Sequence, residues 1–436
     1  MYCNQCSMVA GAACTKVGVC GKDADIQSLQ ENLLYALKGI SAYVYHAREL
    51  GKADEEVDAF LAEGLYSTLT NVDFDLERFI KLNLKAGEIN VRAMRNLRQA
   101  HIDAFGAHEP AQVETGTVAG PGILVTGHNM KALYELLRQS EGQGVNIYTH
   151  SEMLPAHGYP RLRAFSHLRG NLGGSWIDQR QLFSEFSGAI LGTTNCVVLP
   201  RESYKERMFT CGITGLPGVR HIEGYDFTPV IELAKKLPPL PEAPGKTVLT
   251  TGFSAGNVLP LAGKIIEAVE QGKISHFFLV GGCDAPGKGH QYYREFVQAA
   301  AERPDVVILT LACGKFRFND LDLGTIDGIP RLIDLGQCND AIHAIDIAVA
   351  LSEALGCPVN DLPLTLVLSW MEQKAAAILM SLFSLGIKGI YLGPKLPAWI
   401  TPAVLAVLQK EFDLRQTGEP REDLAAMLGG QKVRTA

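Results

Sequence analysis

Four cysteines near the start of the chain, Cys3, Cys6, Cys14 and Cys20, are spaced closely enough to surround one metal centre. Thiolates are soft ligands that favour iron–sulfur clusters or zinc. Structural zinc sites usually combine two short cysteine pairs, and only Cys3 and Cys6 form such a pair here. We therefore expect a [4Fe–4S] cluster at these cysteines, and zinc is the alternative.

A second group of possible ligands follows the segments that we predict as strands. In doubly wound folds, ligands bind at the carboxyl ends of parallel strands. A single buried cysteine or solvated carboxylate needs no metal to explain it, but one metal-capable residue follows each of seven predicted strands. These residues are His128, Glu152, Cys196, Cys283, Cys313, Cys338 and Glu372. Together they predict a second metal centre in a cleft between two domains.

The donor types of this second group indicate which metal it would bind. Four thiolates suit iron, whereas one imidazole and two carboxylates add harder donors. We therefore expect an iron cluster with oxygen as well as sulfur bridges, or one that is incompletely coordinated. The two remaining cysteines, Cys211 and Cys357, belong to neither group, and we expect both to be structural.

The pattern of apolar residues predicts the elements that position these ligands. Helical spacing extends over residues 26–50, with Asp25 as the expected N-cap, and over residues 54–70 and 74–98. From about residue 120 the pattern becomes an alternation of strands and helices, which is typical of parallel α/β sheets. The expected strands cover residues 123–126, 145–149, 189–194, 248–253, 276–280, 306–311, 332–335, 364–369 and 389–392.

A proline-rich segment, residues 237–245, marks the best candidate for a domain boundary. The predicted fold is an α/β fold with an N-terminal helical domain and two doubly wound, Rossmann-like domains with parallel sheets. The helical domain would cover residues 1–117 and hold the first cluster. The two α/β domains would cover residues 118–240 and 241–436, with the second cluster in the cleft between them.

Composition excludes several classes of function. The 436 residues carry a net charge of −7, which argues against nucleic acid and anionic membranes as partners. No uncharged run reaches the about 18 residues that span a bilayer. The first residues contain no basic or apolar leader, so we expect a cytoplasmic protein whose clustered cysteines bind metal instead of forming disulfides. Residues 282–288 match the phosphate-binding loop only in part, because Gly289 stands where Ser or Thr should follow.

Several longer motifs resemble those of the hybrid-cluster proteins, also called prismane proteins or hydroxylamine reductases. The resemblance includes the N-terminal cysteine array and extends over the whole chain. The other motifs are Thr-Gly-His at 126–128 and the segments at 150–160, 193–196, 278–284, 336–340 and 369–374. The chain is similar to the compact class of this family, which lacks a second N-terminal helical bundle.

The resemblance implies a cofactor for each group of residues. The four N-terminal cysteines would hold a [4Fe–4S] cubane, and the seven residues of the second group a hybrid [4Fe–2O–2S] cluster. Cys283 matches a position that carries a persulfide, and Lys374 matches a lysine beside the cluster. Glu372, Lys374 and Cys283 would then take part in catalysis. If the chain stays extended beyond residue 369, Glu372 and Lys374 point to the same face and Lys374 can donate a proton.

The activity implied by the resemblance belongs to nitrogen metabolism. It is the reduction of hydroxylamine to ammonia and water with two electrons and two protons. Electrons would come from a ferredoxin-like protein or a flavin/iron–sulfur reductase and enter at the cubane of a monomeric enzyme. The alternatives are a nitric oxide reductase, a nitric oxide sensor or S-nitrosylating protein, and a relative of nickel carbon monoxide dehydrogenase.

Overall fold

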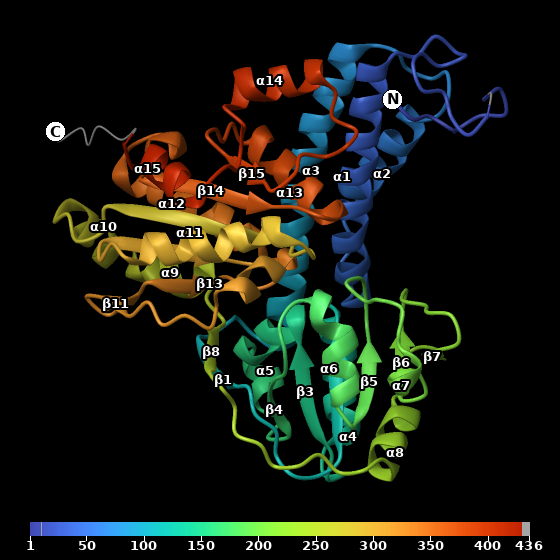
Figure 1. The fold of residues 1–436 in the computed structure, drawn as a ribbon, viewed down its shortest axis with the longest axis vertical. Coiled ribbons are helices and arrows are strands. Elements are labelled where there is room, and N and C mark those ends of the chain that lie inside the picture. Colours follow the sequence, from blue (N-terminus) through green and yellow to red (C-terminus); the bar gives the residue numbers. More distant parts are fainter. Residues whose placement is uncertain (10, 430–436) are drawn as a thin grey trace. The chain divides into compact units, whose positions relative to one another are not determined.

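The computed structural model describes residues 1–9 and 11–429, which form two compact units. The terminal unit combines the beginning and the end of the chain, residues 1–100 and 356–436. The central unit comprises residues 101–355. Figure 1 shows the elements of both units along the chain.

Long helices form the first part of the terminal unit: α1 (Ala24–Glu49), α2 (Glu55–Ser67) and all but the last turn of α3 (Leu76–Phe105). The N-cap of α1 is Asp23, whose side chain accepts a hydrogen bond of 2.8 Å from the backbone N–H of Ile26, so the prediction of Asp25 is wrong. α1 packs against α2 and against α13 (Gln373–Ser384). A Cβ atom on Gly39 of α1 would lie 2.7 Å from the carbonyl oxygen of Gln373, so this close packing requires glycine.

The rest of the terminal unit is a short parallel sheet with two further helices. Its strands are β14 (Leu364–Ser369), β15 (Tyr391–Gly393) and β16 (Arg415–Gln416), paired in that order. The helices are α14 (Pro402–Phe412) and α15 (Pro420–Gly429).

The central unit contains an eight-stranded sheet in the order β7-β6-β5-β2-β3-β4-β1-β8. Its strands are β1 (Ala111–Glu114), β2 (Gly122–Thr126), β3 (Asn146–His150), β4 (Leu168–Asn171), β5 (Ala189–Gly192), β6 (Met208–Cys211), β7 (Arg220–Ile222) and β8 (Val248–Thr251). Adjacent strands are parallel except β1 and β8. The helices of this part are α4 (Met130–Ser140), α5 (Pro160–Arg163), α6 (Gln179–Glu185), α7 (Glu202–Lys205) and α8 (Thr228–Lys236). The middle strands β2, β3 and β5 are buried at every residue, as expected for parallel strands covered on both faces.

Three more parallel strands of the central unit carry cysteines after their ends. They are β9 (His276–Gly282), β10 (Val306–Thr310) and β13 (Leu332–Asp334), and β10 lies between the other two. The associated helices are α9 (Ala255–Val258), α10 (Ala262–Glu270), α11 (Gln291–Ala301) and α12 (Ile342–Leu355). β11 (Thr325–Ile326) and β12 (Ile329–Pro330) pair as a small antiparallel ribbon.

The structure confirms the predicted helical start and the parallel α/β class, and each of the nine predicted strands coincides with an observed one. Seven observed strands were not predicted, namely β1, β4, β6, β7, β11, β12 and β16. β1 lies in the segment predicted as all-helical, and β8, expected to begin the second α/β domain, pairs with β1. The proline-rich segment runs beside the chain before β2, since Leu240 and Ala243 bridge Gly120 and Thr117. The division into three domains stays a prediction.

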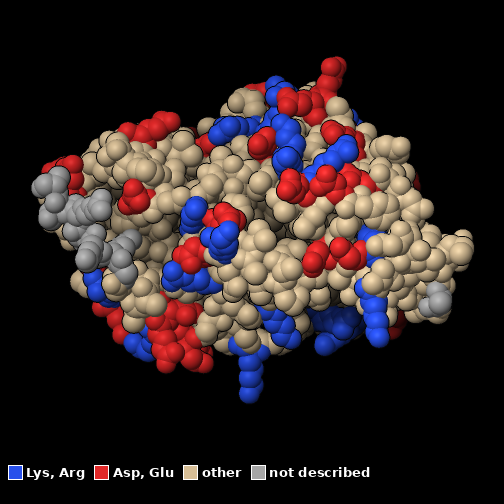
Figure 2. All heavy atoms as spheres, turned by 90° about the horizontal axis from the view of Figure 1, so that it is seen from above, with Lys and Arg blue, Asp and Glu red and all other residues tan. Residues whose placement is uncertain are grey.

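Figure 2 shows how charged side chains are distributed on one face of the protein. On the face drawn in Figure 2, acidic and basic side chains are interspersed among uncharged residues, and no basic stripe crosses it. Among the helices that the structure describes, none is both long and apolar enough to cross a membrane.

Candidate metal centres

The four N-terminal cysteines lie together in the terminal unit, where all of them line one pocket. Reciprocal backbone hydrogen bonds of 3.1 and 2.8 Å pair Cys3 with Cys14. The side chain of Lys22 donates a 2.7 Å hydrogen bond to Gln30 of α1, which attaches the cysteine loop to the helix. This arrangement brings together the four thiols that the sequence predicted as ligands of one cluster, and four sulfur donors fit an iron–sulfur centre.

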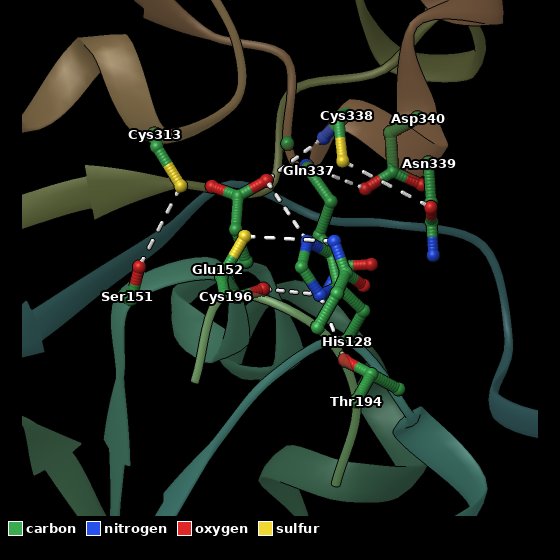
Figure 3. Close-up of polar contacts among 12 residues, drawn as sticks. His128, Ser151, Glu152, Thr194, Cys196, Cys313, Gln337, Cys338, Asn339 and Asp340 are labelled. Atoms are coloured by element: carbon green, nitrogen blue, oxygen red, sulfur yellow. Dashed lines mark hydrogen bonds and ion pairs between the residues drawn. The ribbon is translucent and has the colours of Figure 1, made fainter. Parts of the chain in front are cut away.

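The second group begins with three buried side chains of the central unit (Figure 3). Ligand atoms of His128, Glu152 and Cys338 all lie within 4.8 Å of one another. Nε2 of His128 is 3.8 Å from Oε2 of Glu152, and each side chain is only 1% exposed. An imidazole, a carboxylate and a thiol so close together form a mixed donor set of the kind that binds iron.

The loop after β2 fixes the orientation of His128. Gly127 has φ +111°, and a Cβ atom there would lie 2.4 Å from Oγ1 of Thr193, so the turn requires glycine. A hydrogen bond of 2.9 Å joins Nδ1 of His128 to Oγ1 of Thr194. Metal-binding histidines are usually held in this way through the nitrogen that does not bind the metal.

Cys196 and Cys313 form an adjacent pair of thiols. The neighbouring Cys196 sulfur, burial and the charge of Glu152 together raise the pKa of the Cys313 thiol well above its ordinary value. Oγ of Ser151 is 3.7 Å from the Cys313 sulfur. Anionic forms of these groups would repel one another, and a bound metal cluster supplies the positive charge that makes them compatible. The donor set therefore fits an iron centre.

Three of the loops that carry these ligands adopt a backbone conformation that L-residues seldom use. Ser151, Cys196 and Ala312 have φ values of +54°, +63° and +64°. Such conformations cost of order 1–3 kcal/mol each and occur mainly at functional sites. They stand beside Glu152, at Cys196 and beside Cys313, so the backbone strain coincides with three predicted ligands.

Cys283 directly follows β9 and is partly buried. A Cβ atom on Gly281 would lie 2.7 Å from the carbonyl oxygen of Leu311, so the Gly-Gly pair permits a close approach of β9 to the end of β10. The next residue, Asp284, is held by hydrogen bonds of 2.6 Å from Ser175 and 2.8 Å from Arg317. The loop is firmly placed, and binding of Cys283 to the same metal centre stays a prediction.

Glu372 and Lys374 lie in the terminal unit, after β14. Glu372 directly precedes α13, and Lys374 is a buried residue in the first turn of this helix. The expectation that extended geometry continues from Ser369 to Lys374 is therefore wrong, because the chain turns into a helix at Gln373. The role of both residues at the second metal centre stays a prediction.

Sequence reasoning did not identify the polar residues that hold the ligand loops. The side chain of Gln337 donates a hydrogen bond to the carbonyl oxygen of Glu152, and Lys315 forms a buried ion pair with Asp334. Neither contact has a sequence signature, because the partners are far apart in the chain. Of the cysteines expected to be structural, Cys211 is buried in β6 and Cys357 is partly buried.

Curated relatives match this chain over nearly its whole length. A protein of Moorella thermoacetica named hydroxylamine reductase is 60% identical over 98% of this chain and 100% of its own length. One of the same name from Methanothermobacter thermautotrophicus is 59% identical with the same coverage. A hydroxylamine reductase of Syntrophobacter fumaroxidans is 52% identical over 93% of this chain and 74% of its own longer length.

Solved structures of carbon monoxide dehydrogenases share the fold. Carbon monoxide dehydrogenase IV from Carboxydothermus hydrogenoformans has a TM-score of 0.78 at 15% identity, covering 98% of this chain and 92% of that one. The nickel-free enzyme from Thermococcus sp. AM4 has a TM-score of 0.76 at 18% identity, covering 98% and 90%. The sequence pattern of the Prismane/CO dehydrogenase family matches residues 1–83 and 50–425. This chain belongs to the Prismane/CO dehydrogenase family.

Proposed function

We propose that this protein is a hydroxylamine reductase that converts hydroxylamine to ammonia and water with two electrons and two protons. The observation that carries the proposal is the buried group of His128, Glu152 and Cys338, with Cys196 and Cys313 beside it. It occurs in a chain that is 60% identical to a hydroxylamine reductase over almost its full length.

Two clusters would serve this reaction. Cys3, Cys6, Cys14 and Cys20 would hold a [4Fe–4S] cluster that receives electrons. A hybrid [4Fe–2O–2S] cluster would be held by His128, Glu152, Cys196, Cys283, Cys313, Cys338 and Glu372, with Cys283 as a persulfide. When bound, the hybrid cluster supplies electrons and a Lewis-acidic iron for reduction of the N–O bond.

The protein side chains position the ligands, exclude water and supply protons. The backbone N–H of Cys338 and the amide of Gln337 hold both ends of Glu152, and the buried surroundings of His128 and Glu152 keep bulk water away. In our proposal, Lys374 donates a proton to the departing oxygen of hydroxylamine, and Glu372 is a ligand of the cluster.

The cellular setting forms part of the proposal. All ten cysteines are free of disulfides, which fits a reducing compartment, and we place the protein in the cytoplasm. A ferredoxin-like protein or a flavin/iron–sulfur reductase would deliver the electrons to a monomeric enzyme.

Substrate comparison tests this function. Anaerobically purified protein is supplied with a reduced low-potential donor and, separately, with hydroxylamine or nitric oxide, and carbon monoxide oxidation is measured with an oxidised acceptor. We expect fastest turnover with hydroxylamine, loss of turnover in Cys338→Ala, and normal turnover in Cys211→Ala. Faster turnover with nitric oxide, or nickel-dependent oxidation of carbon monoxide, would replace hydroxylamine reduction as the function.

A further inference from the structure

A lysine is fully buried in the central unit, between two of the loops that carry cysteine ligands. Lys315 is 0% exposed, and its partner Asp334 is 3% exposed. Nζ of Lys315 donates hydrogen bonds to both carboxylate oxygens of Asp334, at 2.9 and 3.0 Å. Its third hydrogen bond, of 3.0 Å, goes to the carbonyl oxygen of Gly336. All three donors of the ammonium group are therefore used.

These bonds connect the residues around two predicted metal ligands. Lys315 lies two residues after Cys313, and Gly336 lies two residues before Cys338. Oδ1 of Asp334 also accepts a 2.9 Å hydrogen bond from the backbone N–H of Gly336. The backbone N–H of Ala312, which has φ +64°, donates to the same Gly336 carbonyl at 3.0 Å. Lys315 thus holds the strained turn before Cys313 against the loop before Cys338.

The charge of Lys315 also acts on the predicted ligands. Its Nζ donates to both carboxylate oxygens of Asp334 and to a carbonyl oxygen, which suits an ammonium cation, and its charge interacts with Glu152 and Cys313. In a buried region of low dielectric constant, such interactions are stronger than in water.

A purely structural ion pair is a weak explanation for this arrangement. Buried ion pairs lose much of their attraction to desolvation and can often be replaced by apolar residues without loss of stability. A cluster that accepts an electron gains negative charge, however, and net charge and hydrogen bonding around a cluster set its reduction potential. A cation fixed two residues from a ligand favours the reduced state.

We propose that Lys315 is a positioning residue of the second metal centre, which holds the Cys313 and Cys338 loops together and raises the reduction potential of the cluster. This inference rests on the proposed function, because it requires an iron cluster at this site. Asp334 offsets part of the positive charge, so the two residues have opposite effects on the potential.

The experiment compares Lys315→Met with the double variant Lys315→Met/Asp334→Asn. Iron content and a redox titration followed by electron paramagnetic resonance are measured on each protein. In Lys315→Met, we expect the equilibrium between oxidised and one-electron-reduced cluster to shift about tenfold toward the oxidised form, or ~59 mV. The equilibrium should shift less in the double variant, because the negative charge of Asp334 is removed together with the positive charge of Lys315. Lys288→Met, which removes an exposed lysine five residues after Cys283, is the matched control and should not shift.

Two further results would overturn the inference. The first is an unchanged potential in Lys315→Met with full iron content. The second is that Lys315→Met loses iron, while the double variant has full iron content and the same reduction potential as the parent protein. That result would show that the ion pair has a structural role only. If Lys315→Met does not fold, Lys315→Arg is measured, because arginine retains the positive charge in a side chain of different shape. The ratio of oxidised to reduced cluster in Lys315→Arg should stay within about twofold of that in the parent protein at the same potential. A larger shift in Lys315→Arg would contradict the charge effect. The titration needs no turnover, so a failed hydroxylamine assay on the parent protein would refute the proposed function alone.

Discussion

The backbone N–H of Cys338 donates a 2.9 Å hydrogen bond to Oε2 of Glu152. Glu152 follows β3 of the eight-stranded sheet, and Cys338 follows β13 of the second group of strands in the central unit. The same carboxylate oxygen is 3.8 Å from Nε2 of His128, which follows β2. The carboxylate of Glu152 therefore contacts residues from two other strand ends, and this junction lies at the centre of the proposed second metal site.

Iron content tests the assignment of two clusters. Two four-iron clusters give about eight irons per chain in anaerobically purified protein. Cys6→Ala should lose roughly half of this iron and retain the spectrum of the second centre, because Cys6 belongs to the N-terminal pocket. Cys211→Ala, at a buried cysteine outside both groups, should retain all of it. Zinc at the N-terminal cysteines would refute the first assignment.

Mass spectrometry tests the persulfide proposed at Cys283. An added sulfur extends the reach of this side chain and makes it a softer donor. The peptide that contains Cys283 should carry one additional sulfur in protein isolated without reductant, and the peptide that contains Cys357 should not. A plain thiol at Cys283 in fully active protein would exclude the persulfide from the mechanism.

The substitution Lys374→Met tests the proposed proton donor, because it keeps the length of the side chain and removes the ammonium group. Turnover of hydroxylamine should fall by ~10²-fold or more, the usual scale for loss of a general acid, with both clusters present. Lys388→Met, which changes an exposed lysine of the same unit, should turn over hydroxylamine at the rate of the parent protein. Normal turnover in Lys374→Met would exclude proton donation, and loss of the second cluster would indicate a structural role.

Buried histidines predict how stability depends on pH. Burial lowers the pKa of His157 to about 4 and that of His101 to about 3, from the ordinary 6.5. Both imidazoles are neutral in the folded protein and take up protons on unfolding, so the free energy of unfolding falls as the pH decreases from 6.5 toward 4. Each of these histidines lowers the free energy of unfolding by about 1.4 kcal/mol for each unit of decreasing pH within this range.

Denaturant unfolding at several pH values measures this effect. His157→Gln should reduce the slope of the free energy of unfolding against pH by about the contribution of one histidine. An equal slope in His157→Gln and the parent would show that His157 does not couple protonation to folding.

The sequence was sufficient to predict that the proposed ligands follow strands, because strands rich in apolar residues end at recognisable places. His128, Glu152, Cys196, Cys283, Cys313, Cys338 and Glu372 each follow an observed strand within four residues. Local chemistry was less decisive at helix ends, since Asp23 and Asp25 are both good N-caps and only Asp23 meets the backbone N–H of Ile26.

The remaining features depend on contacts between distant parts of the chain. The pairing of β8 with β1 joins residues that are more than a hundred positions apart, and a short apolar run does not indicate its partner. The start of α13 at Gln373 ends the extended geometry expected for Lys374. The sequence alone does not distinguish Lys315 from a surface lysine, and only the fold brings it into contact with Asp334 and Gly336.

The balance of electrons and product measures the central claim most directly. Anaerobic protein with both clusters is mixed with hydroxylamine in large molar excess over the protein and with a still larger excess of a reduced one-electron donor, and the oxidised donor and the ammonium are both counted. Hydroxylamine reduction requires two donor molecules oxidised for each ammonium formed, over many turnovers. Donor oxidation without ammonium, or ammonium in no more than the molar amount of the protein, would contradict the assignment of this protein as a hydroxylamine reductase.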